Sequence, residues 1–99
     1  MSNETFGAYI KKARETINLT LRKVAAHLDI DTSTLSKVER GDRHASPDYL
    51  KPLAAILKLN LKEVQTKFIA DKISKDFGGM EHLTDGLKAA EQQIKKKKK

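Results

Sequence analysis

Apolar residues recur at helical spacing along most of the chain. The first group shares one side of an amphipathic helix that Ser2 or Asn3 can cap. A second group predicts a helix capped by Thr20 and ended by Asp29, and a third follows Ser46. The groups are Phe6, Ile10, Ala13 and Ile17; Leu21, Val24, Ala25 and Leu28; and Leu50, Leu53, Ala54 and Leu57. This pattern predicts an all-α fold.

One short predicted helix, from residue 32 to about 39 or 40, has an unusual composition. Asp31 can cap its start, and Gly41 is a stop signal. Leu35 and Val38 are expected to face the core, whereas the remaining surface is crowded with small hydroxyl groups. Those hydroxyl residues are Thr32, Ser33, Thr34 and Ser36. Residues of this type compete with the helix backbone for hydrogen bonds, so their concentration calls for a reason.

Two further helix starts can be predicted from local chemistry. Pro52 cannot donate a backbone hydrogen bond and crowds the carbonyl of Asp48, so we expect the regular helix to begin near 48–50 or to be kinked there. Asn60 and Glu63, three positions apart, resemble a capping box that opens the next helix.

That next helix is predicted to run to about Phe77, where Gly78 and Gly79 break the chain. Its expected buried residues are Val64, Phe68 and Ile69. We therefore divide the chain into a domain at 1–77 and a C-terminal helical extension at 78–99.

Apolar residues in the extension recur at three- and four-residue spacing, as in a coiled-coil seam, but for only two heptads. They are Met80, Leu83, Leu87, Ala90 and Ile94. Gly86 and Asp85 weaken a continuous helix. Two interpretations remain open: a terminal helix packed on its own domain, or a dimer seam. The lysines at 95–99 are interpreted as a solvated helix end.

Composition narrows the class of protein. The chain has 99 residues, the size of one domain, with 38% hydrophobic, 33% charged and 5% aromatic residues, as expected for a helical globular protein. It contains no cysteine, so disulfides and thiolate zinc sites are excluded. We find neither a membrane span nor a secretion signal and expect a cytoplasmic protein. Lysines 95–99 supply five units of the net charge of +7, so global charge is weak support for a nucleic-acid partner.

Residues 20–41 carry the most specific pattern. Two helices with apolar inner faces are joined by a turn of three or four residues, with small Ala25 where they cross, and the unit ends in Glu39, Arg40 and Gly41. Together with Arg14 and the pair Leu53 and Ala54, this resembles the helix-turn-helix family of the lambda repressor and Cro type, often called the Xre family. The resemblance covers about 6–59 and implies a five-helix DNA-binding domain, here with an additional C-terminal helix.

The resemblance assigns roles to named residues. It implies an ion pair between Arg14 and Glu39 and places the helix at 32–40 in the major groove of double-stranded DNA. The expected base-reading residues are Thr32, Ser33, Ser36 and Lys37, because short hydroxyls permit close approach and can bond base edges. The expected phosphate-binding residues are Arg22, Lys23, Thr34, Arg40, Arg43 and His44. The competing explanations are that the hydroxyl residues are ordinary helix caps and that the basic residues are solvated surface charges.

Two positions depart from the family pattern. Leu21 stands where many members carry a glutamine that supports a phosphate contact, so that contact cannot be transferred. Asp29 stands where glycine usually makes the turn, but Asp tolerates the left-handed conformation at modest cost. Short stretches at 50–54, 68–73 and 86–94 also resemble a bacterial subgroup of these regulators that includes restriction-modification controllers.

The predicted function is sequence-specific transcriptional regulation by a homodimer on a pseudo-palindromic operator, associated with the bacterial nucleoid when DNA-bound. The alternative is a protein-interaction module of the same fold, such as a coactivator or antitoxin. An enzyme is not expected, since His27, His44 and His82 lie on separate elements and no metal-ligand spacing or phosphate-cradling loop is present. We expect no cofactor, metal, membrane or small-molecule partner.

Overall fold

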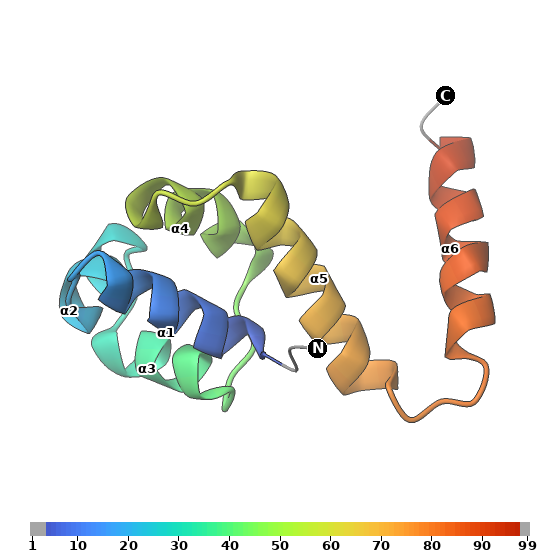
Figure 1. The fold of residues 1–99 in the computed structure, drawn as a ribbon, viewed down its shortest axis with the longest axis horizontal. Coiled ribbons are helices and arrows are strands. Elements are labelled where there is room, and N and C mark those ends of the chain that lie inside the picture. The colour runs from blue at the N-terminus through green and yellow to red at the C-terminus, as the bar shows by residue number, and fades with distance from the viewer. Residues whose placement is uncertain (1–3, 98–99) are drawn as a thin grey trace.

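The computed structural model describes residues 4–97, and within that range the chain forms helices joined by short loops, with no strand (Figure 1). The elements are α1 (Phe6–Thr16), α2 (Leu21–His27), α3 (Thr32–Arg40), the 3-10 turn η1 (Pro47–Tyr49), α4 (Leu50–Leu57), α5 (Leu61–Phe77) and α6 (Leu83–Lys97). The all-α class predicted from the sequence is confirmed.

The start of α1 is capped by a residue that the sequence pattern did not single out. The hydroxyl oxygen of Thr5 accepts a hydrogen bond from the backbone N–H of Ala8 at 3.1 Å. Ser2 and Asn3, the expected caps, lie outside the described residues. The helix therefore begins at Phe6, with its cap immediately before it.

Two of the other predicted N-caps make the expected bond. The side chains of Thr20 and Asn60 accept hydrogen bonds from the backbone N–H groups of Lys23 and Glu63, both at 3.1 Å. Asp31 occupies the N-cap position of α3 with extended backbone, but its side chain makes no cap hydrogen bond. The prediction for Asp31 was thus right about position and wrong about the bond.

Pro52 has the predicted effect on the fourth helix. The chain first makes the 3-10 turn η1, in which the Ser46 hydroxyl accepts from the N–H of Asp48 at 3.2 Å. Regular α-helix begins at Leu50, so Pro52 lies within the first turn of α4, where its missing N–H costs no helical hydrogen bond.

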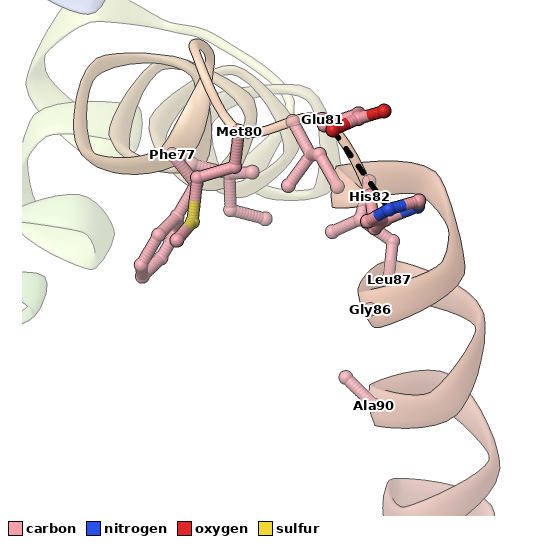
Figure 2. Close-up of a pocket in the computed structure, with 9 residues that line it drawn as sticks. Phe77, Met80, Glu81, His82, Gly86, Leu87 and Ala90 are labelled. Atoms are coloured by element: carbon pink, nitrogen blue, oxygen red, sulfur yellow. Dashed lines mark ion pairs between the residues drawn. The ribbon is translucent and has the colours of Figure 1, made fainter.

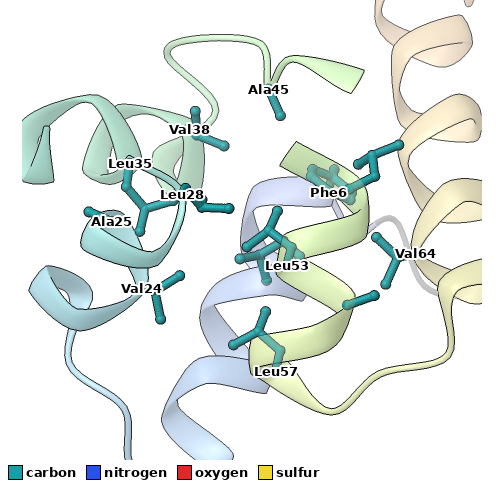
Figure 3. Packing of buried hydrophobic residues seen from close by; sticks show 13 residues of the cluster. Phe6, Val24, Ala25, Leu28, Leu35, Val38, Ala45, Leu53, Leu57 and Val64 are labelled. Carbon is teal, nitrogen blue, oxygen red and sulfur yellow. The ribbon is translucent and has the colours of Figure 1, made fainter. Parts of the chain in front are cut away.

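The core lies among α1 to α5 (Figure 3). Its centre consists of side chains that are fully removed from water, and the rest are at most 9% exposed. The buried apolar residues are Phe6, Ile10, Val24, Ala25, Leu28, Leu35, Val38, Ala45, Leu50, Leu53, Ala54, Leu57 and Val64. This core joins the two helices at 21–40 to three supporting helices, which makes the position of α3 a property of the whole domain.

Only the first half of α5 takes part in the core. Val64 is buried, and Phe68 is half-buried with its ring edge-on to Phe6, at 5.4 Å between centroids. Ile69 was expected to be buried but is 53% exposed. It follows Phe68 on the helix by one residue and so points about 100° away from the core.

The terminal helix α6 does not pack on the domain. None of its described residues is buried, and it stands away from α1 to α4 beyond the bend that follows α5 (Figure 1). Gly86 does not interrupt it, because the helix is continuous from Leu83 to Lys97. The interpretation of this segment as a helix packed on its own domain is therefore wrong.

Candidate nucleic-acid interface

The hydroxyl-rich helix α3 is anchored from beneath by Leu35 and Val38, which are 0% and 3% exposed. Ser33 and Lys37, one turn apart, are exposed on the opposite side of the helix. This arrangement is the one that the apolar pattern predicts. An outward polar edge and a fixed aliphatic base give α3 a rigid surface that another molecule can approach.

The other predicted contact residues of α3 differ in how far they are exposed to solvent. Thr32 is exposed at the first position of α3, whereas Ser36 and Thr34 are half-buried at the two flanks of the outward edge. The fully exposed surface of α3 is therefore a strip centred on Ser33 and Lys37. Contacts of these residues with DNA remain predictions.

The turn between α2 and α3 is closed without glycine. Asp29 has a φ of 58°, in the left-handed region that is expected where the family pattern has glycine. Backbone N–H groups of Asp29 and Ile30 donate to the carbonyls of Ala26 and Ala25, at 3.1 and 3.0 Å. Ala25 is 1% exposed, so its small side chain allows the close crossing of the two helices. This turn fixes the angle at which α3 is presented.

The structure contains the ion pair between Arg14 of α1 and Glu39 of α3. Nε and Nη2 of Arg14 donate to the two carboxylate oxygens of Glu39 at 2.8 and 3.0 Å, and Nη1 donates to the Leu19 carbonyl at 2.9 Å. The side chains are only 11% and 4% exposed. The hydrogen bond to Glu39 raises the pKa of Arg14 above its ordinary value, against the opposing effect of burial. Both charges are satisfied, and α3 is fixed to α1.

Gly7 provides a second attachment of α1 to the end of α3, and it was not identified from the sequence. A Cβ at this position would lie 2.5 Å from the carbonyl oxygen of Glu39 and closer still to that of Val38. Only glycine allows this approach. The available signal was a glycine inside a helical pattern, which is unfavourable unless packing requires it.

Basic residues lie at both ends of the two-helix unit. Arg22 and Lys23 are exposed in the first turn of α2, and Arg43 and His44 are exposed in the loop after α3. Arg40 is exposed but lies 3.5 Å from Asp42, which balances part of its charge. Among the described residues, Arg40 is the one predicted basic phosphate contact that forms an ion pair, whereas Arg22, Lys23, Arg43 and His44 form none.

The fold also brings Lys72 and Lys75 of α5 to this end of α3. They line one small crevice together with Arg43 and His44. Their Nζ atoms lie 3.6 and 3.3 Å from the carboxylates of Asp76 and Asp71, respectively. No local pattern links α5 to the loop at 41–46, so their proximity could not be read from the sequence.

Comparison with known proteins agrees with this geometry. The family model for the helix-turn-helix matches residues 10–64, more than half of the chain. The chain belongs to the helix-turn-helix family. The region matched by the family model includes α2, α3 and the turn between them, together with most of α1 and all of α4. The resemblance to the Xre type is thereby confirmed.

Curated relatives of this helix-turn-helix protein carry names of the same kind. It is 35% identical over 54 residues to an HTH-type transcriptional regulator, Rv0474, of Mycobacterium tuberculosis, and 36% identical over 55 residues to the HTH-type transcriptional regulator RghRB of Bacillus subtilis. The matches cover 54% of this chain but only 39% and 40% of the relatives. The chain therefore matches about two fifths of their length, which limits the comparison to the matched domain.

A solved structure supports the fold over a longer range. The clp gene regulator ClgR from Corynebacterium glutamicum is similar with a TM-score of 0.58 at 21% identity, over 92% of this chain and 83% of that chain. The lambda repressor-like fold class is confirmed by this similarity.

At 4–97, no group of three or more His, Asp or Glu side chains is arranged to hold a metal ion. No helix in that part of the chain is long and apolar enough to cross a membrane.

Proposed function

We propose that the protein is a sequence-specific DNA-binding transcriptional regulator that acts as a homodimer on a pseudo-palindromic operator. The observation that carries the proposal is the outward polar edge of α3, Ser33 and Lys37, held by the buried Leu35 and Val38. A helix with such an edge fits the major groove, where hydroxyl and ammonium groups can bond base edges.

The surrounding charges support the same orientation. Arg22 lies in the first turn of α2 and Arg43 in the loop that follows α3, so each can meet a phosphate on one side of the groove. Thr32, Ser36 and Thr34 complete the proposed surface at the edges of α3. Phosphate contacts would set the register of the helix, and Ser33 and Lys37 would distinguish the bases.

Two-fold pairing follows from the small size of one recognition helix. A single α3 reads only a few base pairs, and two copies related by a two-fold axis can read half-sites about 34 Å apart. A regulator of this kind acts on chromosomal DNA, so the proposal includes the bacterial cytoplasm and association with the nucleoid when DNA is bound.

The test begins with enrichment of bound duplexes from a random library, which should yield a two-fold symmetric motif. Fluorescence anisotropy then compares the chain with its Ser33→Glu, Lys37→Glu variant on that motif. We expect the affinity to fall by at least roughly 100-fold, because two base contacts are lost and like charges face the groove.

A matched control separates position from charge. Lys62→Glu with Gln65→Glu makes the same change in charge at exposed positions near the start of α5, on the α4 side of the domain (Figure 1). This variant should lose affinity only slightly. Equal losses in both variants, or absence of any enriched motif, would contradict the proposal and favour the protein-interaction module.

A further inference from the structure

Large apolar side chains remain in water at the end of α5 and along α6. Ile69, Phe77, Met80, Leu87 and Ile94 are between 42% and 63% exposed. Single exposed apolar residues are ordinary, but a contiguous set marks a binding surface.

These residues form one continuous groove. Near the bend after α5, Phe77 and Met80 lie on one side of a hollow of about 610 Å³, and Leu87 and Ala90 project from α6 on the other (Figure 2). Neighbouring hollows of about 620 and 360 Å³ extend it to Ile69 and to Ile94. Ile73 and Leu87 line all three. We call this surface the α5–α6 groove.

We propose that the α5–α6 groove is filled by α6 of a second copy of this chain, and that the two copies exchange these helices reciprocally. The inference rests on the homodimer of the proposed function and identifies its contact surface. Closed two-fold pairing uses the same patch on both copies, and here α6 is both a wall of the groove and the element available to enter it.

The exposed area agrees with a dimer of ordinary size. A half-exposed side chain of this kind leaves roughly 100 Å² in water, so the five exposed residues offer on the order of 500 Å² per copy. A standard interface buries about 800 Å² per partner, of which the apolar centre is the larger part. The surrounding polar rim of α5 and α6 supplies the remainder.

The segment at 80–97, which consists of the turn before α6 and α6 itself, is complementary to itself in the antiparallel direction. Met80 in that turn and Ile94 on the helix each lie seven residues from Leu87, so a two-fold axis at Leu87 places each Met80 near the partner's Ile94. Acidic Glu81 and Asp85 lie at the start of the segment, and the lysines at 95–97 lie at its end. Antiparallel pairing about this axis brings Glu81 near the partner's Lys95, whereas parallel pairing would place the lysines side by side.

Cross-linking tests the occupant directly, because the chain has no cysteine of its own. Under mild oxidation, Leu87→Cys should form a disulfide-linked dimer, since the axis brings the two Cα atoms within the range of about 7 Å that a disulfide spans. Gln92→Cys, on the opposite side of α6, should remain monomeric in denaturing gels. Equal cross-linking of the two variants would overturn the proposal.

A mixture of Met80→Cys and Ile94→Cys proteins tests the direction of pairing. The antiparallel arrangement requires the mixed disulfide between the two variants to predominate. Predominant Met80→Cys homodimers would overturn it.

Sedimentation of the full chain separates this surface from DNA binding. Leu87→Asp should raise the monomer–dimer dissociation constant at least about 100-fold, because it places charge at the centre of the interface, while Gln92→Asp should leave it unchanged. The circular dichroism of the Leu87→Asp variant should equal that of the wild-type chain, because Leu87 lies outside the core. If Leu87→Asp still dimerises, or if the wild-type chain is monomeric, the α5–α6 groove is not the dimer interface.

The two proposals fail in different ways. The Leu87→Asp variant should keep the wild-type affinity for a single half-site and lose the gain from a second half-site. A dimer that depends on Leu87 but binds no specific DNA would refute the regulator and support the groove. Specific DNA binding with dimerisation untouched by Leu87→Asp would do the reverse.

Discussion

Arg14 and Glu39 lie 25 positions apart in the sequence and meet in a two-bond ion pair that fixes α1 to the end of α3. Since burial leaves the two side chains 11% and 4% exposed, neither charge can be rehydrated without moving a helix. The contact therefore positions the helix that carries Ser33 and Lys37.

Removing one partner should be far more damaging than the pair's net contribution suggests. We expect Arg14→Ala to lower the free energy of unfolding in urea by roughly 3–5 kcal/mol, because it leaves the Glu39 carboxylate buried and unpaired. Arg40→Ala breaks the exposed pair with Asp42 and should cost less than about 1 kcal/mol. Similar losses in the two variants would show that the Arg14 pair is not a buried anchor.

Gly7 should tolerate no side chain. In Gly7→Ala the new methyl group meets the carbonyls of Val38 and Glu39, so α1 and α3 must separate, at a cost of at least about 1–3 kcal/mol in urea unfolding. Gly86 has no atom near its hypothetical Cβ, and Gly86→Ala should instead increase the helical circular dichroism of α6. A stable Gly7→Ala variant would contradict the close approach seen here.

The extent to which the sequence predicts this fold depends on the range of the interaction. Helix boundaries and the burial of Leu35 and Val38 follow from local spacing, and the left-handed turn at Asp29 follows from the resemblance. The cap at Thr5 was not predicted, because the spacing of apolar residues does not show which of several neighbouring polar residues caps the helix. Asp31 illustrates the reverse case, where a favourable residue occupies the position without making the bond.

Tertiary packing accounts for the other differences. Ile69 belongs to an apolar pattern, but α5 extends past the core after Phe68, so half of its side chain remains in water. The meeting of Gly7 with α3, and of Lys72 with the loop that carries Arg43, depends on how α1 and α5 cross the other helices. No short stretch of sequence contains that information.

Base-reading and phosphate-binding residues should differ in salt dependence and specificity. Arg43→Ala should weaken binding to all duplexes to a similar degree and reduce the slope of log affinity against log salt concentration by about 2 for the dimer, since one phosphate contact is lost per copy. Ser33→Ala should leave that slope unchanged and relax the preference at one base position of each half-site. Anisotropy titrations over a salt series, on the selected motif and single-base variants, measure both quantities. A salt slope altered by Ser33→Ala would move that residue to the phosphate contacts.

The hydrogen bond between Tyr9 and Glu63 predicts how the free energy of unfolding changes at alkaline pH. The Tyr9 hydroxyl donates to a carboxylate oxygen of Glu63 at 2.6 Å, joining α1 to α5. Burial, and then this hydrogen bond, raise the pKa of Tyr9 above its ordinary value, so the folded chain retains a proton that the unfolded chain loses near pH ~10. Stability from this pair is therefore complete below about pH 10 and declines as pH rises toward the folded pKa.

Tyr9→Phe isolates that contribution because it removes the hydroxyl and keeps the ring, over which the Lys67 ammonium lies at 5.4 Å from the centroid. At neutral pH we expect it to cost about 1 kcal/mol in urea unfolding, the usual contribution of one hydrogen bond. The gap between wild type and variant should close as pH rises above about 10, since ionised Tyr9 cannot donate to Glu63. Tyr49→Phe, the matched control, should show no such convergence. A gap that stays constant through the alkaline range would mean that the Tyr9 proton is not held by Glu63.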